Sequence, residues 1–189
     1  MAVKAPERLH YTGFDEADEL LARDPFALLV GFALDQQVPV QTAFQGPWKL
    51  QQRLGTLDPG AIAATDPARL EEAFRKKPAI HRFPGAMAGR VHELAAHVAD
   101  EYGGDASRLW TEAADGAELR QRISALPGFG QMKVKAFGAV LWKRFGLAAA
   151  EELDPGHPTL GDVDSPEALE EYQAKKRAYK AKLRAERAG

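Results

Sequence analysis

A turn rich in proline and glycine, Leu126-Pro127-Gly128-Phe129-Gly130, is the part of the sequence best suited to binding chemistry. Proline is tolerated near the boundary of an element, and glycine permits a tight turn and the close approach of another backbone. The residues from Gln131 onward open a helix whose first N–H groups have no partner within the helix. Those amides can bind a phosphate, and Lys133 and Lys135 add positive charge beside them. The alternative is an ordinary corner between two helices.

Composition limits the classes of protein that the chain can represent. Its 189 residues, of which 45% are hydrophobic, fit one domain or two small lobes that share a cleft. The absence of cysteine excludes disulfides, cysteine-ligated zinc and iron–sulfur clusters, and it fits a reducing compartment. Neither a signal-peptide pattern nor an apolar run long enough to span a membrane is seen. We therefore expect a cytoplasmic protein with no membrane partner.

Positive charge is concentrated in one segment of the chain. The net charge is −2, which argues against a protein that binds polyanions over its whole surface. The segment 121–146, however, contains no acidic residue and five basic ones, namely Arg122, Lys133, Lys135, Lys143 and Arg144. A local basic patch on a nearly neutral body suits a protein that contacts a few phosphates.

The pattern of caps and apolar residues predicts an all-α fold. Asp24-Pro25, Asp58-Pro59 and Asp66-Pro67 are typical helix starts, with aspartate as the cap and proline in the first turn. The segment 26–34 is apolar nearly all round, which indicates a buried central helix. We expect helices at 15–23, 26–34, 40–54 (with a kink or junction at Gly46-Pro47), 60–64, 68–75, 87–102, 108–113, 117–125, 133–145 and from 164 or 165 to about 187, and loops at 76–86 and 148–161.

Four segments resemble one family in the same order. The turn at 126–130 resembles the hairpin of the helix-hairpin-helix (HhH-GPD) DNA glycosylases of base excision repair, most closely their compact actinobacterial-type branch. The other three segments are Leu28–Val38, Arg82–Val98 and Pro158–Asp164, and the resemblance covers about residues 20–172. It implies a two-lobed all-α fold with a cleft between the lobes. Lobe one would be about 40–145, with the hairpin, and lobe two about 11–39 plus 146–189.

The resemblance implies a monomeric, monofunctional N-glycosylase that acts on a damaged or modified base flipped out of double-stranded DNA. We would expect such a protein to be nucleoid-associated if its source is a bacterium. Gln36 and Gln37 would contact DNA, with Gln37 filling the gap that the flipped base leaves; the alternative is a glutamine that caps the buried helix. No cofactor is required, although the family implies a structural K⁺ or Na⁺ at the backbone of Gly128 and Gly130. The residues that would hold the DNA backbone are Leu126, Gly128, Phe129, Gly130, Gln131, Lys133 and Lys135.

By the same resemblance, Asp164 is the catalytic carboxylate. It would oppose the positive charge that grows on the sugar, and it could orient a water molecule. The alternative is an ordinary N-cap, because Asp164 precedes a strong helix start. Asp162 and Asp154 are rivals, since the loop between Gly146 and Asp164 is longer than in the family, which leaves the register open.

A lyase reaction would need an amine nucleophile. In bifunctional relatives a lysine stands two residues after the second hairpin glycine, where this chain has Met132. Lys133 is next to that position, but a shift of one residue turns a side chain by about 100° around a helix. We therefore expect no lyase activity.

Several aromatic and polar residues are candidates for stacking or hydrogen bonding with a flipped base, although most would also suit a core: His81, Arg82, Trp48 and Phe44, with Phe14, Phe83 and Trp110 as further members. The last segment, 165–189, has seven basic and four acidic residues. It could lie along DNA outside the bound site or form a solvated helix. Two other functions stay open, namely a non-catalytic protein that recognises damaged or structured DNA, and a small all-α interaction protein with an accidental hairpin.

Overall fold

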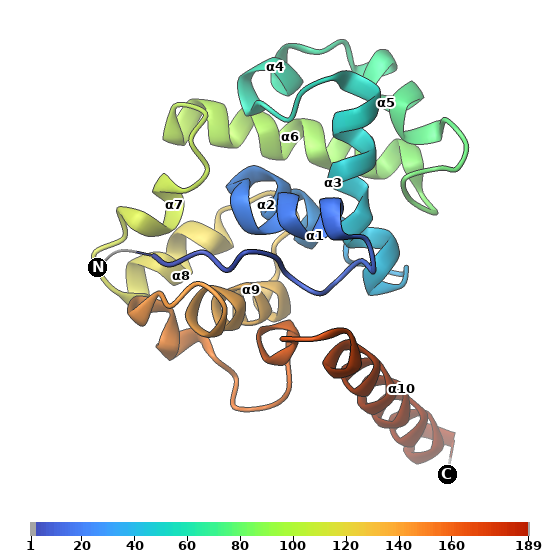
Figure 1. Ribbon diagram of the computed structural model, residues 1–189, viewed down its shortest axis with the longest axis vertical. Coiled ribbons are helices and arrows are strands. Elements are labelled where there is room, and N and C mark those ends of the chain that lie inside the picture. The colour runs from blue at the N-terminus through green and yellow to red at the C-terminus, as the bar shows by residue number, and fades with distance from the viewer. Residues whose placement is uncertain (1–2, 189) are drawn as a thin grey trace.

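The computed structural model describes residues 3–188, and every regular element within them is a helix (Figure 1). The predicted all-α class is confirmed. The elements are α1 (Asp15–Arg23), α2 (Pro25–Leu34), α3 (Val40–Leu54), α4 (Pro59–Ala64), α5 (Pro67–Arg75), α6 (Pro84–Tyr102), α7 (Arg108–Thr111), α8 (Gly116–Ser124), α9 (Gln131–Lys143), the 3₁₀ helices η1 (Ala148–Leu153) and η2 (Leu160–Asp162), and α10 (Pro166–Ala188).

The helix ends follow the signals in the sequence. Asp24 caps α2, because its carboxylate accepts hydrogen bonds from the amides of Phe26 (2.9 Å) and Ala27 (3.2 Å). The prediction placed the start of α6 too late, since Pro84 occupies its first turn, where the missing N–H costs nothing. No junction divides the helix at Gly46-Pro47, because α3 runs through both residues. The predicted loop 148–161 contains η1 and the start of η2.

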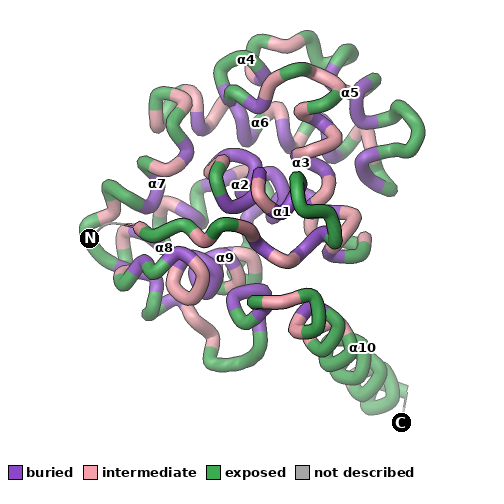
Figure 2. Tube along the Cα trace, viewed as in Figure 1, coloured by how far each residue is buried: buried purple, intermediate pink, exposed green. Residues whose placement is uncertain are grey.

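Helix α2 is the centre of the fold. All its residues except Pro25 are buried, which follows from its apolar composition and is visible as the purple core segment of Figure 2. Gly31 lets α3 approach closely, because a Cβ at this position would lie 2.8 Å from Cε1 of Phe44. On the other side, the rings of Phe32 and Phe137 meet edge to face at 5.2 Å, which packs α9 against α2.

The helices form two groups around α2 (Figure 1). Helices α3 to α6 lie on one side, and α7 to α9 lie on the other with η1 and η2. Gly138 permits the contact between α9 and η1, because a Cβ there would lie 2.7 Å from Cδ2 of Leu153. The predicted lobe boundary between residues 145 and 146 therefore runs through a close contact.

Helix α10 leaves the body at an angle and points into solvent (Figure 1). Leu169 is its buried residue, and nearly all residues from Ala174 onward are exposed. The side chains of Gln41 and Gln173 exchange hydrogen bonds of 3.1 and 2.7 Å, which fix the first turns of α10 to the start of α3. The rest of α10 is held by its own helical hydrogen bonds.

Candidate nucleic-acid interface

The hairpin between α8 and α9 is anchored by its two apolar residues. Leu126 and Phe129 are buried, and the ring of Phe129 meets Phe137 edge to face at 6.2 Å. Gly128 has φ +79°, a conformation that favours glycine, whereas Gly130 is extended with φ −81°. Both glycines are exposed. The side chains of the turn thus point inward, and its backbone faces solvent.

The start of α9 leaves backbone donors free. Gly130 is the N-cap and has no side chain to accept from them, and the first hydrogen bond of the helix runs from the Val134 amide to the Gly130 oxygen (3.0 Å). Within residues 3–188 the amides of Gln131, Met132 and Lys133 have no acceptor. Helix α8 differs, because Asp115 caps its N-terminus. The start of α9 can therefore accept an anion.

Arg90 is a basic residue at the hairpin that the sequence analysis missed. A Cβ at Gly128 would lie 2.8 Å from Cδ of Arg90, so this side chain of α6 packs directly over the turn. Lys133 reaches inward and its Nζ donates to the Ala33 oxygen at the end of α2 (3.1 Å). Burial lowers the pKa of Lys133; the carboxylate of Asp35 opposes this shift, and the charge of Arg90 adds to it. Lys135 is exposed.

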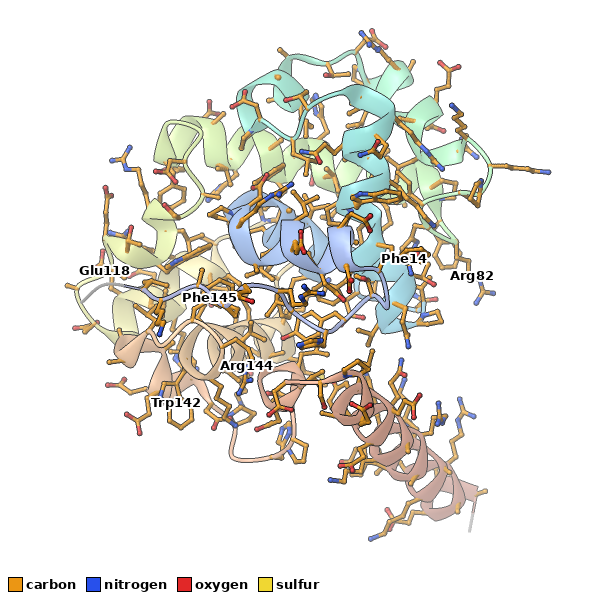
Figure 3. The ribbon with its side chains drawn as sticks, in the orientation of Figure 1. Phe14, Arg82, Glu118, Trp142, Arg144 and Phe145 are labelled. Atoms are coloured by element: carbon orange, nitrogen blue, oxygen red, sulfur yellow. The ribbon has the colours of Figure 1, made fainter. Side chains whose placement is uncertain are left out.

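The basic segment 121–146 is not one patch in the structure. Lys143 lies at the far end of α9, where its Nζ is 2.8 Å from Oδ1 of Asp162 and 3.1 Å from Oδ2 of Asp154. Arg144 is at the same end (Figure 3). Arg122 donates through Nε to Glu118 at 2.9 Å. Lys133 and Lys135 are thus the members of the segment that lie at the start of α9.

The turn between α2 and α3 presents Gln37 to solvent. Gln37 has φ +58° and is the one non-glycine residue with positive φ in the described chain. The side chain of Gln36 folds inward, with Nε2 3.3 Å from the sulfur of Met87 and 3.5 Å from the Ala33 oxygen. A left-handed glutamine is strained and persists only where the surrounding structure fixes it. The structure therefore holds Gln37 at the tip of a fixed turn.

His81 is one of the groups that fix this turn. It is buried, and its Nε2 lies 3.1 Å from the Leu34 oxygen and 3.0 Å from the Gln36 oxygen. Its Nδ1 accepts from the amide of Phe83 (3.0 Å), which places the proton of the neutral ring on Nε2. Burial lowers the pKa of His81, the two carbonyl contacts oppose the shift, and the charge of Lys133 adds to it. The predicted role of His81 in a base pocket would have to compete with these three contacts.

Helix α6 joins the hairpin to the glutamine turn. Met87 contacts Gln36, and Arg90, one turn further along, packs over Gly128. Together with the bond from Lys133 to Ala33, these contacts bring the hairpin, the 81–90 segment and the turn at 35–37 into one region. Three of the segments that were separate in the sequence therefore meet in space.

Asp35 is a second residue of this region that the sequence analysis did not select. It is half-buried at the end of α2. Burial raises the pKa of its carboxyl group, and the positive charges of Lys176, Lys133 and Lys180 oppose that shift. Burial, with the negative charges of Asp35 and Asp162, raises the pKa of Tyr172 on α10 to about 12. Asp35 therefore lies within electrostatic range of basic residues on both α9 and α10.

The three predicted catalytic aspartates differ in how far they are engaged. Asp164 is exposed, and it is Ser165 that caps α10, because the Ser165 Oγ accepts from the Ala168 amide at 3.1 Å. Asp162 accepts from the Thr159 amide (2.8 Å) and pairs with Lys143, which also holds Asp154. Burial alone would raise the pKa of Asp162. The hydrogen bonds outweigh burial, and the pKa is therefore lower than its usual value. Asp164 keeps the freest carboxylate of the three.

The aromatic candidates separate into core and surface residues. Phe44 and Trp110 are buried, and the rings of Phe44 and Phe32 lie 5.2 Å apart in the core. Trp48 is half-buried and stacks on Phe14, with ring centroids 6.4 Å apart and planes inclined by 10°. Phe14 is 54% exposed and Phe83 is 40% exposed, with the guanidinium of Arg82 over the Phe83 ring at 5.3 Å. Figure 3 shows Phe14 and the outward-pointing Arg82 on the same side of the molecule.

Two shallow hollows on the surface lie away from the hairpin and the glutamine turn. The first, of about 310 Å³, lies between the start of α2, the start of α4 and the segment that follows α6. The second, of about 510 Å³, lies between the end of α3 and α5.

No protein-family model, curated protein or solved structure matches the chain. Among residues 3–188, no helix is both long and apolar enough to cross a membrane, and no cluster of three His, Cys, Asp or Glu side chains could hold a metal ion. The function of the interface is therefore inferred from its own chemistry.

Proposed function

We propose that the protein binds double-stranded DNA through the hairpin and acts as a monofunctional DNA N-glycosylase in base excision repair. The observation that supports this most is the joining of three features in one region: the uncapped start of α9, Arg90 above Gly128, and the strained, exposed Gln37. The resemblance of the motifs to HhH-GPD glycosylases supports the same function. A glycosylase must hold the backbone, fill the gap left by the flipped base and stabilise a cationic sugar.

The backbone is held at the hairpin. The free amides of Gln131, Met132 and Lys133 donate to a phosphate, and Arg90 supplies a guanidinium beside them. Lys135 is exposed one turn into α9 and contacts a neighbouring phosphate. The K⁺ or Na⁺ that the resemblance implies would be held by backbone carbonyl oxygens of the turn, the donor type that such ions take, and would add positive charge near the phosphate.

The gap is filled by Gln37. Its amide can both donate and accept, so that it can pair with the base left without a partner. The fixed turn lowers the cost of ordering the side chain on binding. Arg82, Phe83 and Phe14 are exposed, and Trp48 is half-buried against Phe14; a flipped base can stack on these side chains.

The sugar cation is stabilised by a carboxylate, and Asp164 is our first candidate. Asp154 and Asp162 are rivals whose charge is already shared with Lys143. Asp35 joins them, because it stands next to Gln36 and Gln37 in the same turn. We expect Asp164→Asn to lower base release at least tenfold, because removal of a preorganised charge typically costs this much or more. Full activity of Asp164→Asn would remove Asp164 from the proposal. In that case the matched variants Asp154→Asn, Asp162→Asn and Asp35→Asn would identify the catalytic carboxylate.

The function is tested with a panel of duplexes that carry deaminated, alkylated, oxidised or hydroxymethylated bases. Each duplex is incubated with the protein and then treated with alkali, which cleaves the strand wherever a base has been released. Strand cleavage on at least one lesion, and none on the undamaged duplex, is the expected result. Binding without base release on any lesion would contradict a glycosylase.

A second prediction concerns the lyase step. Met132 occupies the position of the lyase lysine and is 85% exposed, whereas Lys133 points inward to Ala33. We therefore expect borohydride to trap no covalent adduct on DNA with an abasic or damaged site. An adduct that disappears in Lys133→Gln would show that the protein is bifunctional.

The second candidate function is a DNA-binding protein without catalysis. It is favoured by the ion pairs of Lys143 with Asp154 and Asp162, because these pairs engage two of the three predicted catalytic carboxylates. The lesion panel separates the two functions, because this candidate predicts tight binding to damaged duplexes with no release of base. A protein that binds no DNA at low salt would contradict both.

A further inference from the structure

We propose that α10 is an interaction surface for the phosphate backbone of duplex nucleic acid, next to the hairpin interface, and that one stripe of the helix makes the contact. The inference rests on the proposed function, because it takes the partner of the hairpin to be DNA. The stripe consists of Lys176, Lys180, Arg184 and Arg187.

The stripe continues the face by which α10 is attached to the body. At about 100° per residue, the four basic residues fall within an arc of about 80°, and Leu169 and Gln173 fall in the same arc. Leu169 is buried and Gln173 is bonded to Gln41, so this arc faces the body in the first turns. Beyond the point where the helix leaves the body, the residues in this arc are basic and exposed, because there is no body for them to pack against.

The stripe carries positive charge that is not neutralised along it. The acidic residues of α10 (Glu167, Glu170, Glu171 and Glu186) lie outside the arc. The one ion pair in the free part of the described helix joins Lys182 to Glu186 at 3.9 Å, also outside the arc. A row of unpaired cations on a rigid support is complementary to a row of phosphates.

The position of the stripe connects it to the interface. Gln173, which lies in the same arc, is bonded to Gln41, four residues after Gln37. The stripe therefore begins beside the start of α3, next to the turn that presents Gln37. The positive charges of Lys176 and Lys180 also act on Asp35 in that turn. From Lys176 to Arg187 the stripe extends about 16 Å, which corresponds to roughly five phosphates along one strand.

An anionic membrane surface fits this helix less well. Interfacial helices need a broad apolar face opposite their charges. Apart from alanines, Tyr179 and Leu183 are the apolar residues beyond Lys176, and they do not form such a face. A helix that binds nucleic acid needs no apolar face, because it contacts the phosphates.

The test compares two double variants of the full chain that remove equal charge. Lys176→Gln with Lys180→Gln removes half of the stripe, and Lys175→Gln with Lys182→Gln removes two lysines from the other side of the same helix. Binding to a duplex of about 30 base pairs with one stable abasic-site analogue is followed by fluorescence anisotropy between about 50 and 200 mM salt. Circular dichroism checks that both variants keep their helix content.

We expect the stripe variant to lower the slope of log Kd against log salt by about 2 and to bind about tenfold more weakly near 0.1 M salt. The control variant should change the affinity less than about threefold, the size of a general charge effect. Equal losses of duplex affinity in the two variants would overturn the proposal that the stripe makes the contact, and they would leave the hairpin proposal intact. A wild-type chain that binds anionic vesicles and no duplex would overturn both.

Discussion

Gly130→Asp should abolish most DNA binding while leaving the fold as stable as before. Gly130 is the N-cap of α9, its backbone is extended, and no atom lies within 4 Å of a Cβ built there. Aspartate is a preferred N-cap, so its carboxylate would accept from the free amides and keep the free energy of unfolding within about 0.5 kcal/mol of wild type or raise it. The same carboxylate would occupy and repel the phosphate site. We expect an affinity loss of about 100-fold near 0.1 M salt.

The matched control is Gly130→Asn, which caps the same amides without a charge. Anisotropy titrations and urea unfolding of both variants separate the two contributions. We expect Gly130→Asn to lower the affinity for DNA about fivefold, because its side chain competes with the phosphate for the free amides. The additional loss in Gly130→Asp would then measure the repulsion between the carboxylate and the phosphate. If Gly130→Asp bound DNA as well as the wild type, the hairpin would be a corner between helices and nothing more.

The helices could be predicted from the sequence because their signals are local. Asp24, Asp58 and Asp66 each stand directly before a proline, and all three cap the helix that follows. The hairpin was predictable for the same reason, since its anchors and its glycines lie within five consecutive residues. Such signals depend on spacing along the chain, which the sequence states directly.

The surroundings of the hairpin could not be predicted, because they depend on contacts between distant segments. Arg90 stands in an amphipathic helix far from the hairpin in sequence, and only the packing of α6 places it over Gly128. Lys143 was counted as part of a basic patch because it is close in sequence, yet it pairs with Asp154 and Asp162 at the other end of α9. Charge counted along a segment overlooks the direction in which each side chain leaves its helix.

The region around Gln37 shows how a structural residue can resemble a functional one. His81, in a loop between two prolines, had the features of a base contact in the sequence. In the structure its ring is buried and holds the end of α2 through the oxygens of Leu34 and Gln36. We infer that His81 acts on DNA through Gln37, by fixing the turn that presents it.

His81→Ala should be among the most destabilising single substitutions in the chain. It removes the donor to the Gln36 oxygen and the acceptor of the Phe83 amide, and it leaves a cavity in a buried position, whereas the Leu34 oxygen keeps the hydrogen bond from the Gln36 amide (2.8 Å). Buried groups without partners cost about 1–3 kcal/mol each, so we expect the free energy of unfolding to fall by about 3 kcal/mol or more. For a chain of this size the melting temperature should fall by about 6–12 °C. His157→Ala, at an exposed position, is the control and should change stability by less than about 0.5 kcal/mol.

The pH dependence of this effect gives a second readout. Because the pKa of His81 is lowered in the folded state, the unfolded chain takes up its proton first as the pH falls below about 6.5. The stability that neutral His81 contributes is therefore present above that pH and is lost as the pH falls through the folded-state value. In urea unfolding, the difference between wild type and His81→Ala should be largest near pH 8 and smaller near pH 5. If His81→Ala unfolded like the wild type at both pH values but lost base release, His81 would contact the base directly and would not be the support of Gln37.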